Sequence, residues 1–253
     1  MKRYFIAFCL SATIAIIGLT SWQSICFAQT KSFDTSQIGE IKEIVRNYLL
    51  QNPGIIREVL TALEKSDQED RVATIATAIS DNRKELHATA DGMMLGNPDG
   101  DVTMVEFFDY NCGYCKRATP DLLALLETDG KLRVILKEFP ILSQDSVIAA
   151  RASIAAAKQG RYLDFHTRLM SAKGVANEAR TIQIAEQLGL DIELMRKDMR
   201  NQETKQIIAQ SKELASKIGI SGTPAYIVGE TLIPGAIGID SLRQVIAQVR
   251  AAN

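Results

Sequence analysis

The sequence lacks any run of lysine and arginine and any basic stripe. Its 29 basic and 30 acidic residues nearly cancel, which leaves a formal net charge of −1. Because nucleic-acid binding depends on clustered positive charge, nucleic acid is excluded as an expected partner. The chain also holds only four cysteines and two histidines. Because two of the cysteines, Cys9 and Cys26, fall within the N-terminal 28 residues, the rest of the chain has too few for a disulfide framework and lacks the four ligands of a structural zinc ion.

Long hydrophobic runs are absent too, except for one near the N-terminus. There Tyr4–Leu19 is almost wholly apolar and follows the basic residues Lys2 and Arg3. Together with a small-residue end before Gln29, this is the pattern of a signal peptide. We therefore expect residues 1–28 to be removed and the mature protein to be soluble and exported to the periplasm.

Removal of the signal peptide also removes Cys9 and Cys26, and leaves only Cys112 and Cys115. Two cysteines separated by two residues suit a redox pair, half of a metal site, or a structural disulfide. A structural disulfide here would close a very small loop, which stabilises a fold only slightly. Two closely spaced thiolates also suit a soft ion such as Cu(I), so a copper site stays open as an alternative.

Residues 29–91 carry helical patterns and no strand signals. Apolar residues recur at spacings of three and four over 38–49, 55–63 and 72–86, and Asn52-Pro53-Gly54 separates the first two stretches. The pattern predicts three helices that are too thinly apolar to form a domain alone. Their apolar faces are expected to bury against the rest of the chain or against other copies of the same segment.

Residues 92–253 begin with turn-forming residues over 95–101, and strand and helix patterns then follow one another along the chain. The expected elements, in chain order, are a strand over 102–108, a helix over 116–127, a strand over 132–139, a helical block over 143–218, strands over 224–228 and 231–235, and a helix over 240–249. This order predicts an α/β fold in which a βαβ unit and a hairpin share one sheet, with a large helical insertion between them.

The cysteine pair lies where the first of these strands ends and the next helix begins. Unpaired N–H groups and the positive end of the helix dipole at that position stabilise a thiolate on Cys112. Cys115 lies one turn later and is expected to be more shielded. Cys112 is therefore the expected nucleophile, and Cys115 the thiol that resolves the mixed disulfide.

The stretch EFFDYNCGYCKRATP resembles the active-site strand and helix of thioredoxin-fold disulfide oxidoreductases. Pro120, within that stretch, matches the helix-kinking proline of these proteins. The helical insertion and the signal peptide are similar to the DsbA branch of the family. The resemblance covers about residues 92–253 and implies a thioredoxin fold with an inserted helical subdomain.

The resemblance also implies roles for residues beyond the two cysteines. Thr223 and Pro224 match the cis-proline loop that binds substrate. Glu106 matches the buried acid beneath the active site, and we expect it to relay the proton of the Cys115 thiol. Lys137, on the following strand, resembles the basic neighbour of that acid.

The dipeptide between the cysteines departs from the DsbA oxidases, which have Pro-His there. Gly113-Tyr114 resembles the disulfide isomerase DsbC and the suppressor-of-copper-sensitivity C proteins, some of which oligomerise through an N-terminal helical stalk. Residues 29–91 are similar to such a stalk, which implies a homo-oligomer. Tyr114 is expected to face substrate, and without the histidine the protein should be a weaker oxidant.

The expected function is that of a protein-disulfide oxidoreductase, which forms or isomerises disulfides in exported proteins. Its redox group is the Cys112–Cys115 pair, so no separate cofactor and no resident metal are expected. The expected partners are exported proteins with cysteines and a membrane protein that recycles the pair. The alternative is a periplasmic copper-stress protein that binds copper through the same two thiolates. Pro224 favours the enzyme, because a copper carrier has no need of a loop that positions a substrate backbone.

Overall fold

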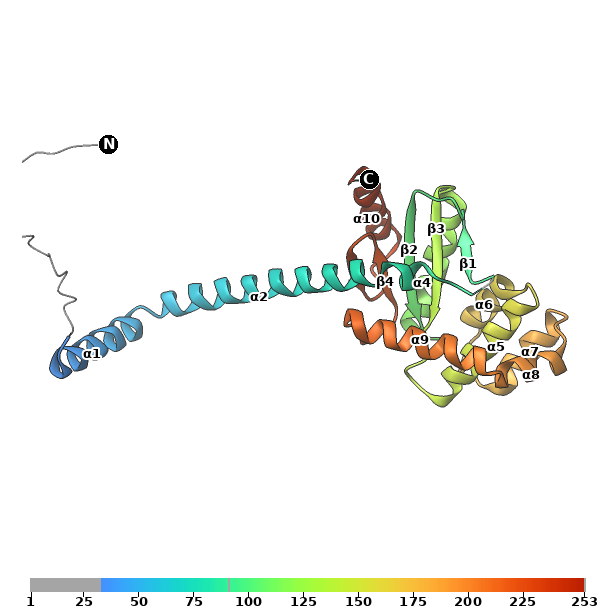
Figure 1. The fold of residues 1–253 in the computed structure, drawn as a ribbon, viewed down its shortest axis with the longest axis horizontal. Helices are drawn as coiled ribbons and strands as arrows, with labels where there is room; N and C mark the ends of the chain where they lie inside the picture. Colours follow the sequence, from blue (N-terminus) through green and yellow to red (C-terminus); the bar gives the residue numbers. More distant parts are fainter. Residues whose placement is uncertain (1–32, 91, 253) are drawn as a thin grey trace, which may run out of the picture. The chain divides into compact units, whose positions relative to one another are not determined.

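The computed structural model describes residues 33–90 and 92–252, and the signal peptide expected over 1–28 lies outside this part of the chain. The chain divides into two compact units, an N-terminal unit ending at Leu60 and a C-terminal unit from Thr61 onward. The helices are α1 (Thr35–Gln51), α2 (Pro53–Asp81), α3 (Arg83–His87), α4 (Gly113–Thr128), α5 (Gln144–Lys158), α6 (Tyr162–Ser171), α7 (Glu178–Gln187), α8 (Ile192–Arg200), α9 (Gln202–Ile218) and α10 (Ile239–Ala252) (Figure 1). The strands are β1 (Met94–Gly96), β2 (Val102–Phe108), β3 (Leu132–Glu138), β4 (Ala225–Val228) and β5 (Thr231–Pro234).

In the N-terminal unit, both ends of α1 are capped. The Asp34 side chain accepts from the Gln37 backbone N–H, and the Gln37 side chain accepts from the Asp34 N–H, which forms a capping box. Asn52 caps the C-terminus of α1, and Pro53 opens α2, a position at which its missing N–H costs nothing. No residue of α1 is buried.

The prediction of separate helices over 55–63 and 72–86 is wrong, because α2 is continuous from Pro53 to Asp81. The apolar stripe lapses over 64–71, but the residues there are mostly charged and favour a helix, and Lys65 pairs with Glu69 one turn later. The apolar stripe therefore stops over 64–71 because this part of α2 is exposed on all sides, and the helix itself continues.

The C-terminal unit includes the last turns of α2. Ile79 and Leu86 are both about 1% exposed, and Ile75 packs against the same cluster. The contacts therefore divide the chain at residue 60, whereas the sequence pattern placed the division at residue 91. Ile75, Ile79 and Leu86 of the predicted apolar faces thus bury within the chain, whereas Leu63, Val72 and most apolar side chains before residue 61 stay exposed.

The sheet has five strands in the order β1-β3-β2-β4-β5, with β2 and β3 parallel and every other neighbouring pair antiparallel. Successive residues of β2 face opposite sides of the sheet, so Met104 and Phe108 join one core cluster while Val105 and Phe107 join another. Helices α4, α6 and α10 contribute to the first cluster, and α2, α3 and α9 contribute to the second. The predicted thioredoxin fold, with both faces of its sheet covered, is confirmed.

Strand β1 was not predicted, because residues 95–101 show only turn chemistry. Its three residues pair antiparallel with β3 at the edge of the sheet. A strand of three residues is too short to show an alternation of apolar and polar side chains. Gly96 ends the strand with φ of +76°, and a Cβ there would lie 2.4 Å from the Leu132 carbonyl oxygen. Only glycine fits this position.

The helical block expected over 143–218 is confirmed as α5 to α9. Helices α5 to α8 gather beside the sheet, and α9 runs back from them along the sheet face that carries the second core cluster (Figure 1). Side-chain caps start several of these helices, at Ser143, Asn177, Asp191 and Asn201. Among the helices that the structure describes, none is long and apolar enough to cross a membrane.

Candidate active site

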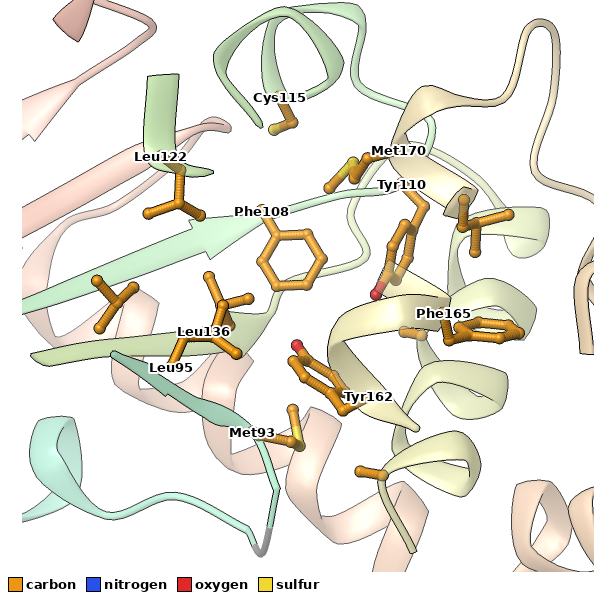
Figure 2. Close-up of a cluster of buried hydrophobic side chains, with 14 of the residues drawn as sticks. Met93, Leu95, Phe108, Tyr110, Cys115, Leu122, Leu136, Tyr162, Phe165 and Met170 are labelled. Atoms are coloured by element: carbon orange, nitrogen blue, oxygen red, sulfur yellow. The ribbon is translucent and has the colours of Figure 1, made fainter. Parts of the chain in front are cut away.

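Cys112 is the N-cap residue of α4, and residues 109–112 connect it to the end of β2. Its Sγ donates a hydrogen bond to the carbonyl oxygen of Thr223 across 3.2 Å. Cys112 is 6% exposed, whereas Cys115, one turn farther along α4, is fully buried among core side chains (Figure 2). Both are free thiols, and their side chains are hydrogen-bonded to each other. Cys112 is therefore the sulfur that a substrate reaches first.

Glu106 lies on β2 behind the cysteine pair and is 4% exposed. Burial raises the pKa of Glu106 to about 8, and a hydrogen bond with Tyr226, its cross-strand partner on β4, acts in the opposite direction. Burial also raises the pKa of the Cys115 thiol, and the charge of Glu106 and the contact with Cys112 raise it further. A thiol so reluctant to ionise requires a proton acceptor nearby, and Glu106 is close enough for its charge to act on Cys115.

Thr223 and Pro224 form the loop that meets Cys112, and the peptide bond between them is cis, as the sequence predicted. Pro224 is buried, and its carbonyl accepts a hydrogen bond from the Gly235 N–H at 2.8 Å. The loop is thus fastened to the end of β5, and it presents the backbone of Thr223 to the nucleophile. A substrate role for these two residues stays a prediction.

The prediction that Lys137 neighbours Glu106 is wrong. In the parallel register of β2 and β3, Glu106 lies opposite Leu136 and Lys137 lies opposite Phe107, so the two side chains face opposite sides of the sheet. The Lys137 Nζ donates instead to the backbone carbonyls of Glu85 and Ala88. Burial there lowers the pKa of Lys137 to about 8.

Tyr114 lies on the first turn of α4 and is 61% exposed. The Arg117 guanidinium carbon lies 4.3 Å from the centre of its ring, a cation–π contact that orients the ring on the surface. This position beside Cys112 is compatible with the predicted contact to substrate.

Two side chains that were not predicted, Asp109 and Asn111, hold the active-site loop. The buried Asp109 carboxylate accepts from the backbone N–H groups of Asn111, Ile141 and Leu142 at 2.7 to 3.0 Å. The Asn111 side chain accepts from the Ala176 N–H at 2.7 Å and donates to Ser146 at 3.2 Å. The sequence offered one signal for these residues, because Asp and Asn in a turn often bond to the backbone two residues on, as Asp109 does to the Asn111 N–H. The bonds to Ile141, Leu142 and Ala176 join distant parts of the chain.

The residues that the structure describes contain no group of three or more histidine, cysteine, aspartate or glutamate side chains able to hold a metal ion. Among the described residues, the two thiols that could bind a soft ion are those of Cys112 and Cys115 at the active site.

Two family models match the chain. The model described as "DSBA-like thioredoxin domain" matches residues 103–247, which is more than half of the chain. The model described as "Copper resistance protein ScsC N-terminal domain" matches residues 39–69.

The curated relatives differ greatly in length. The Na(+)/H(+) antiporter NhaA 3 of Salinispora tropica is 28% identical over 159 residues, which make up 62% of this chain but only 24% of that protein. The chain thus spans about a quarter of that relative. The "Probable disulfide bond formation protein D" of Bacillus anthracis is 27% identical over 193 residues, with 69% of this chain and 88% of that protein covered.

Solved structures are also similar to the chain. A thioredoxin-like oxidoreductase from Silicibacter pomeroyi is 43% identical and has a TM-score of 0.62, with 66% of this chain and all of that chain covered. A linker-deletion mutant of Proteus mirabilis ScsC is 27% identical and has a TM-score of 0.67, with 88% of this chain and all of that chain covered. From the domain match together with the fold and the cysteine pair, the chain belongs to the family of the DSBA-like thioredoxin domain.

Proposed function

We propose that this protein is a thiol–disulfide oxidoreductase that forms or isomerises disulfides in exported proteins. The observation that carries the proposal is the placement of Cys112. It caps α4, its sulfur lies 3.2 Å from the Thr223 carbonyl, and the fully buried Cys115 lies directly behind it. One sulfur is thus the first that a substrate reaches, and the other is held within reach to resolve the intermediate.

The oxidising reaction starts from the Cys112–Cys115 disulfide. A substrate thiolate attacks the Cys112 sulfur, the Cys112–Cys115 bond breaks, and a mixed disulfide forms between Cys112 and the substrate. The Cys115 sulfur leaves with the electron pair and takes a proton from Glu106, because burial opposes a charge on Cys115. A second substrate thiolate then releases Cys112, so the substrate gains a disulfide and the protein becomes a dithiol.

Isomerisation uses the same groups without net electron transfer. The Cys112 thiolate attacks a wrong disulfide of a substrate, a mixed disulfide forms, and the freed substrate thiolate attacks elsewhere until Cys112 is released. This cycle needs the pair in its reduced form, and the Gly113-Tyr114 dipeptide, with no histidine, is compatible with a weaker oxidant.

An apolar surface beside the pair suits unfolded substrates. Tyr114, Leu142 and Val175 are 54–61% exposed, and Ile141 is 39% exposed. They flank Cys112, because Ile141 and Leu142 bond to the Asp109 carboxylate and Val175 precedes the residue that bonds to Asn111. Apolar segments of incompletely folded proteins are the expected occupants.

The N-terminal unit is proposed to join copies of the chain. Its apolar side chains remain exposed on both helices: Ile38, Ile41, Ile44, Val45, Tyr48, Leu50, Ile56, Val59 and Leu60 are 40–66% exposed. Such a surface favours association in water. Assembled copies would place several pairs around one substrate, which favours isomerisation over oxidation. Export to the periplasm and recycling by a membrane protein complete the proposal.

Copper binding by the same two thiolates is the second candidate. It is favoured by the contact between the two sulfurs and by the match of residues 39–69 to a domain described for a copper resistance protein. Anaerobic titration of the reduced protein with Cu(I) tests it. Binding of one ion that is lost in both Cys112→Ser and Cys115→Ser supports a copper function, whereas no binding at micromolar concentrations removes it.

Trapping of mixed disulfides tests the main proposal. Cys115→Ser should accumulate adducts between Cys112 and exported proteins that contain cysteine, because the resolving thiol is gone. Cys112→Ser is the matched control and should accumulate none. Adducts at equal levels in both variants, or in neither, would contradict the assignment of nucleophile and resolving thiol.

Deletion of residues 29–60 tests the role of the N-terminal unit. This deletion spares Ile75, Ile79 and Leu86, which pack in the C-terminal unit, so the active site should remain folded. The expected product is a monomer that still oxidises a model dithiol but loses most repair of scrambled disulfides. The full-length variant Ile44→Asp is the control for chain length and should behave alike. A monomeric wild-type protein in light scattering at micromolar concentrations would refute the assembly.

A further inference from the structure

Tyr110 lies in the active-site loop, between Asp109 and Cys112. It is 1% exposed, and its hydroxyl lies near three polar atoms. These are the Ser153 Oγ at 2.6 Å, the His166 Nδ1 at 3.1 Å and the Glu138 Oε1 at 3.3 Å. A single hydroxyl thus connects the loop before the nucleophile to three other side chains.

The three partners come from three different elements. Glu138 is the last residue of β3, Ser153 lies on α5 and His166 lies on α6, so the hydroxyl ties the active-site loop to the sheet and to two inserted helices. The Phe108 ring packs edge-on against Tyr110 at 5.1 Å and against His166 at 4.9 Å. Asn111 adds a second link from the loop to α5, through its bond to Ser146 at 3.2 Å, but the Tyr110 hydroxyl links the loop to α5, to α6 and to β3 at once.

Tyr162, on α6, provides an internal comparison. Its hydroxyl donates to the same Glu138 Oε1 at 3.5 Å, and in Figure 2 the hydroxyls of Tyr110 and Tyr162 point toward one another. Both rings are almost fully buried. Only Tyr110 belongs to the active-site loop, whereas Tyr162 lies at the start of α6.

The surroundings favour uncharged side chains in this cluster. Burial raises the pKa of Glu138 well above its usual range, and the charge of Asp109 raises it as well, although hydrogen bonds from Ser153 and the tyrosines oppose this. Burial lowers the pKa of His166 to about 3. The Glu138 Oε2 has no hydrogen-bond partner among the described residues, which a neutral carboxyl tolerates better than a carboxylate.

We propose that Tyr110 is a positioning residue for Cys112, and that its hydroxyl, held by Glu138, Ser153 and His166, sets the reactivity of the nucleophile. Asp109 and Asn111 fix the backbone of the loop, and the Tyr110 hydroxyl fixes the depth at which the loop meets the sheet. Loss of the hydroxyl allows the loop to shift and changes the position of the Cys112 sulfur, which in the intact protein lies 3.2 Å from the Thr223 carbonyl oxygen. A displaced sulfur no longer meets a reagent or a substrate in the same geometry, and its reaction slows.

The test compares Tyr110→Phe with Tyr162→Phe in the otherwise unchanged protein. Each substitution removes one hydroxyl from Glu138 and keeps a buried ring. Tyr110→Phe also removes the contacts with Ser153 and His166, so its loss of stability is expected to be the larger one and is measured separately. The readouts are the rate of Cys112 alkylation by iodoacetamide in the reduced protein and the equilibrium constant with glutathione, with thermal unfolding as the measure of stability. In Tyr110→Phe the alkylation rate at pH 7 should fall about threefold to tenfold, the range that corresponds to one net hydrogen bond. In Tyr162→Phe it should change by less than about twofold, even where stability falls as much.

Equal rates in wild type and Tyr110→Phe, or an equal fall in both variants, would overturn the proposal. If Tyr110→Phe does not fold, Ser153→Ala takes its place, because it removes the shortest contact of the hydroxyl and leaves the ring; an unchanged rate there would be equally decisive. The inference rests on the proposed function for its importance but not for its test. Alkylation reports on the thiol itself, whereas failure of the oxidoreductase function would appear as absence of trapped substrates in Cys115→Ser.

Discussion

Replacement of Glu106 by glutamine should remove a pH dependence from the stability of the C-terminal unit. Burial raises the pKa of Glu106 from 4.5 to about 8 in the folded protein. Between these values the folded state keeps a proton that the unfolded chain releases, so the free energy of unfolding of the wild type falls as the pH rises. The contribution is fully present below pH 4.5 and is lost by about pH 8. At about 1.4 kcal/mol for each pH unit, the whole fall is ~5 kcal/mol.

Glutamine has nearly the shape of a protonated glutamate and still bonds to Tyr226, but it cannot ionise. The difference in unfolding free energy between Glu106→Gln and wild type should therefore be near zero at pH 4 and grow toward ~5 kcal/mol at pH 9. Urea unfolding followed by circular dichroism, with a reductant to keep the dithiol form, measures it at each pH. Glu127→Gln, on the exposed side of α4, is the matched control and should follow the wild type. Parallel curves for Glu106→Gln and wild type from pH 4 to 9 would refute the reasoning.

Three further results are expected from the same geometry. Tyr226→Phe removes the hydrogen bond that lowers the pKa of Glu106, so the pH-dependent loss of stability should extend above pH 8; an end point below that of wild type would contradict it. Lys137→Met should leave the alkylation rate of Cys112 unchanged, because Lys137 lies on the face of the sheet opposite Glu106, and a measurable change in that rate would contradict this placement. In the reduced protein, iodoacetamide should modify Cys112 well before the buried Cys115, as peptide mass spectrometry can establish; faster modification of Cys115 would reverse the assigned roles.

The fold was largely predictable because its elements carry strong local signals. The β2 run is apolar except for Thr103 and Glu106, and Gly229-Glu230 marks the hairpin. Each inserted helix has an apolar stripe, and four of the five begin at a side-chain cap. Strand β1 escaped because three residues at a sheet edge are set by pairing with β3 and not by their own pattern. The continuity of α2 escaped because charged residues extend a helix without leaving an apolar stripe.

The site was predictable only where chemistry and chain position coincide. Cys112 and Cys115 were identifiable from their spacing at the junction of strand and helix. Lys137 was misplaced because a strand of seven residues allows two faces, and only the register with β2 decides which face a side chain takes. Glu138 and Tyr226 escaped because their partners are distant in sequence, so no local pattern connects them to the cysteines.

The same register separates the two buried acids of the sheet. Glu106 lies opposite Leu136 and Glu138 lies opposite Phe108, so both carboxyls project from adjacent parallel strands into the same apolar layer. Each bonds to tyrosine, yet it is the charge of Glu106 that acts on Cys115, while Glu138 bonds to Tyr110 and Tyr162. In the proposed mechanism a proton on Glu106 exchanges with Cys115 during disulfide transfer, whereas a proton on Glu138 stays within a hydrogen-bonded cluster. A displacement of two residues along the strand thus accounts for the two roles that we propose, proton transfer for Glu106 and support of the loop that carries the nucleophile for Glu138.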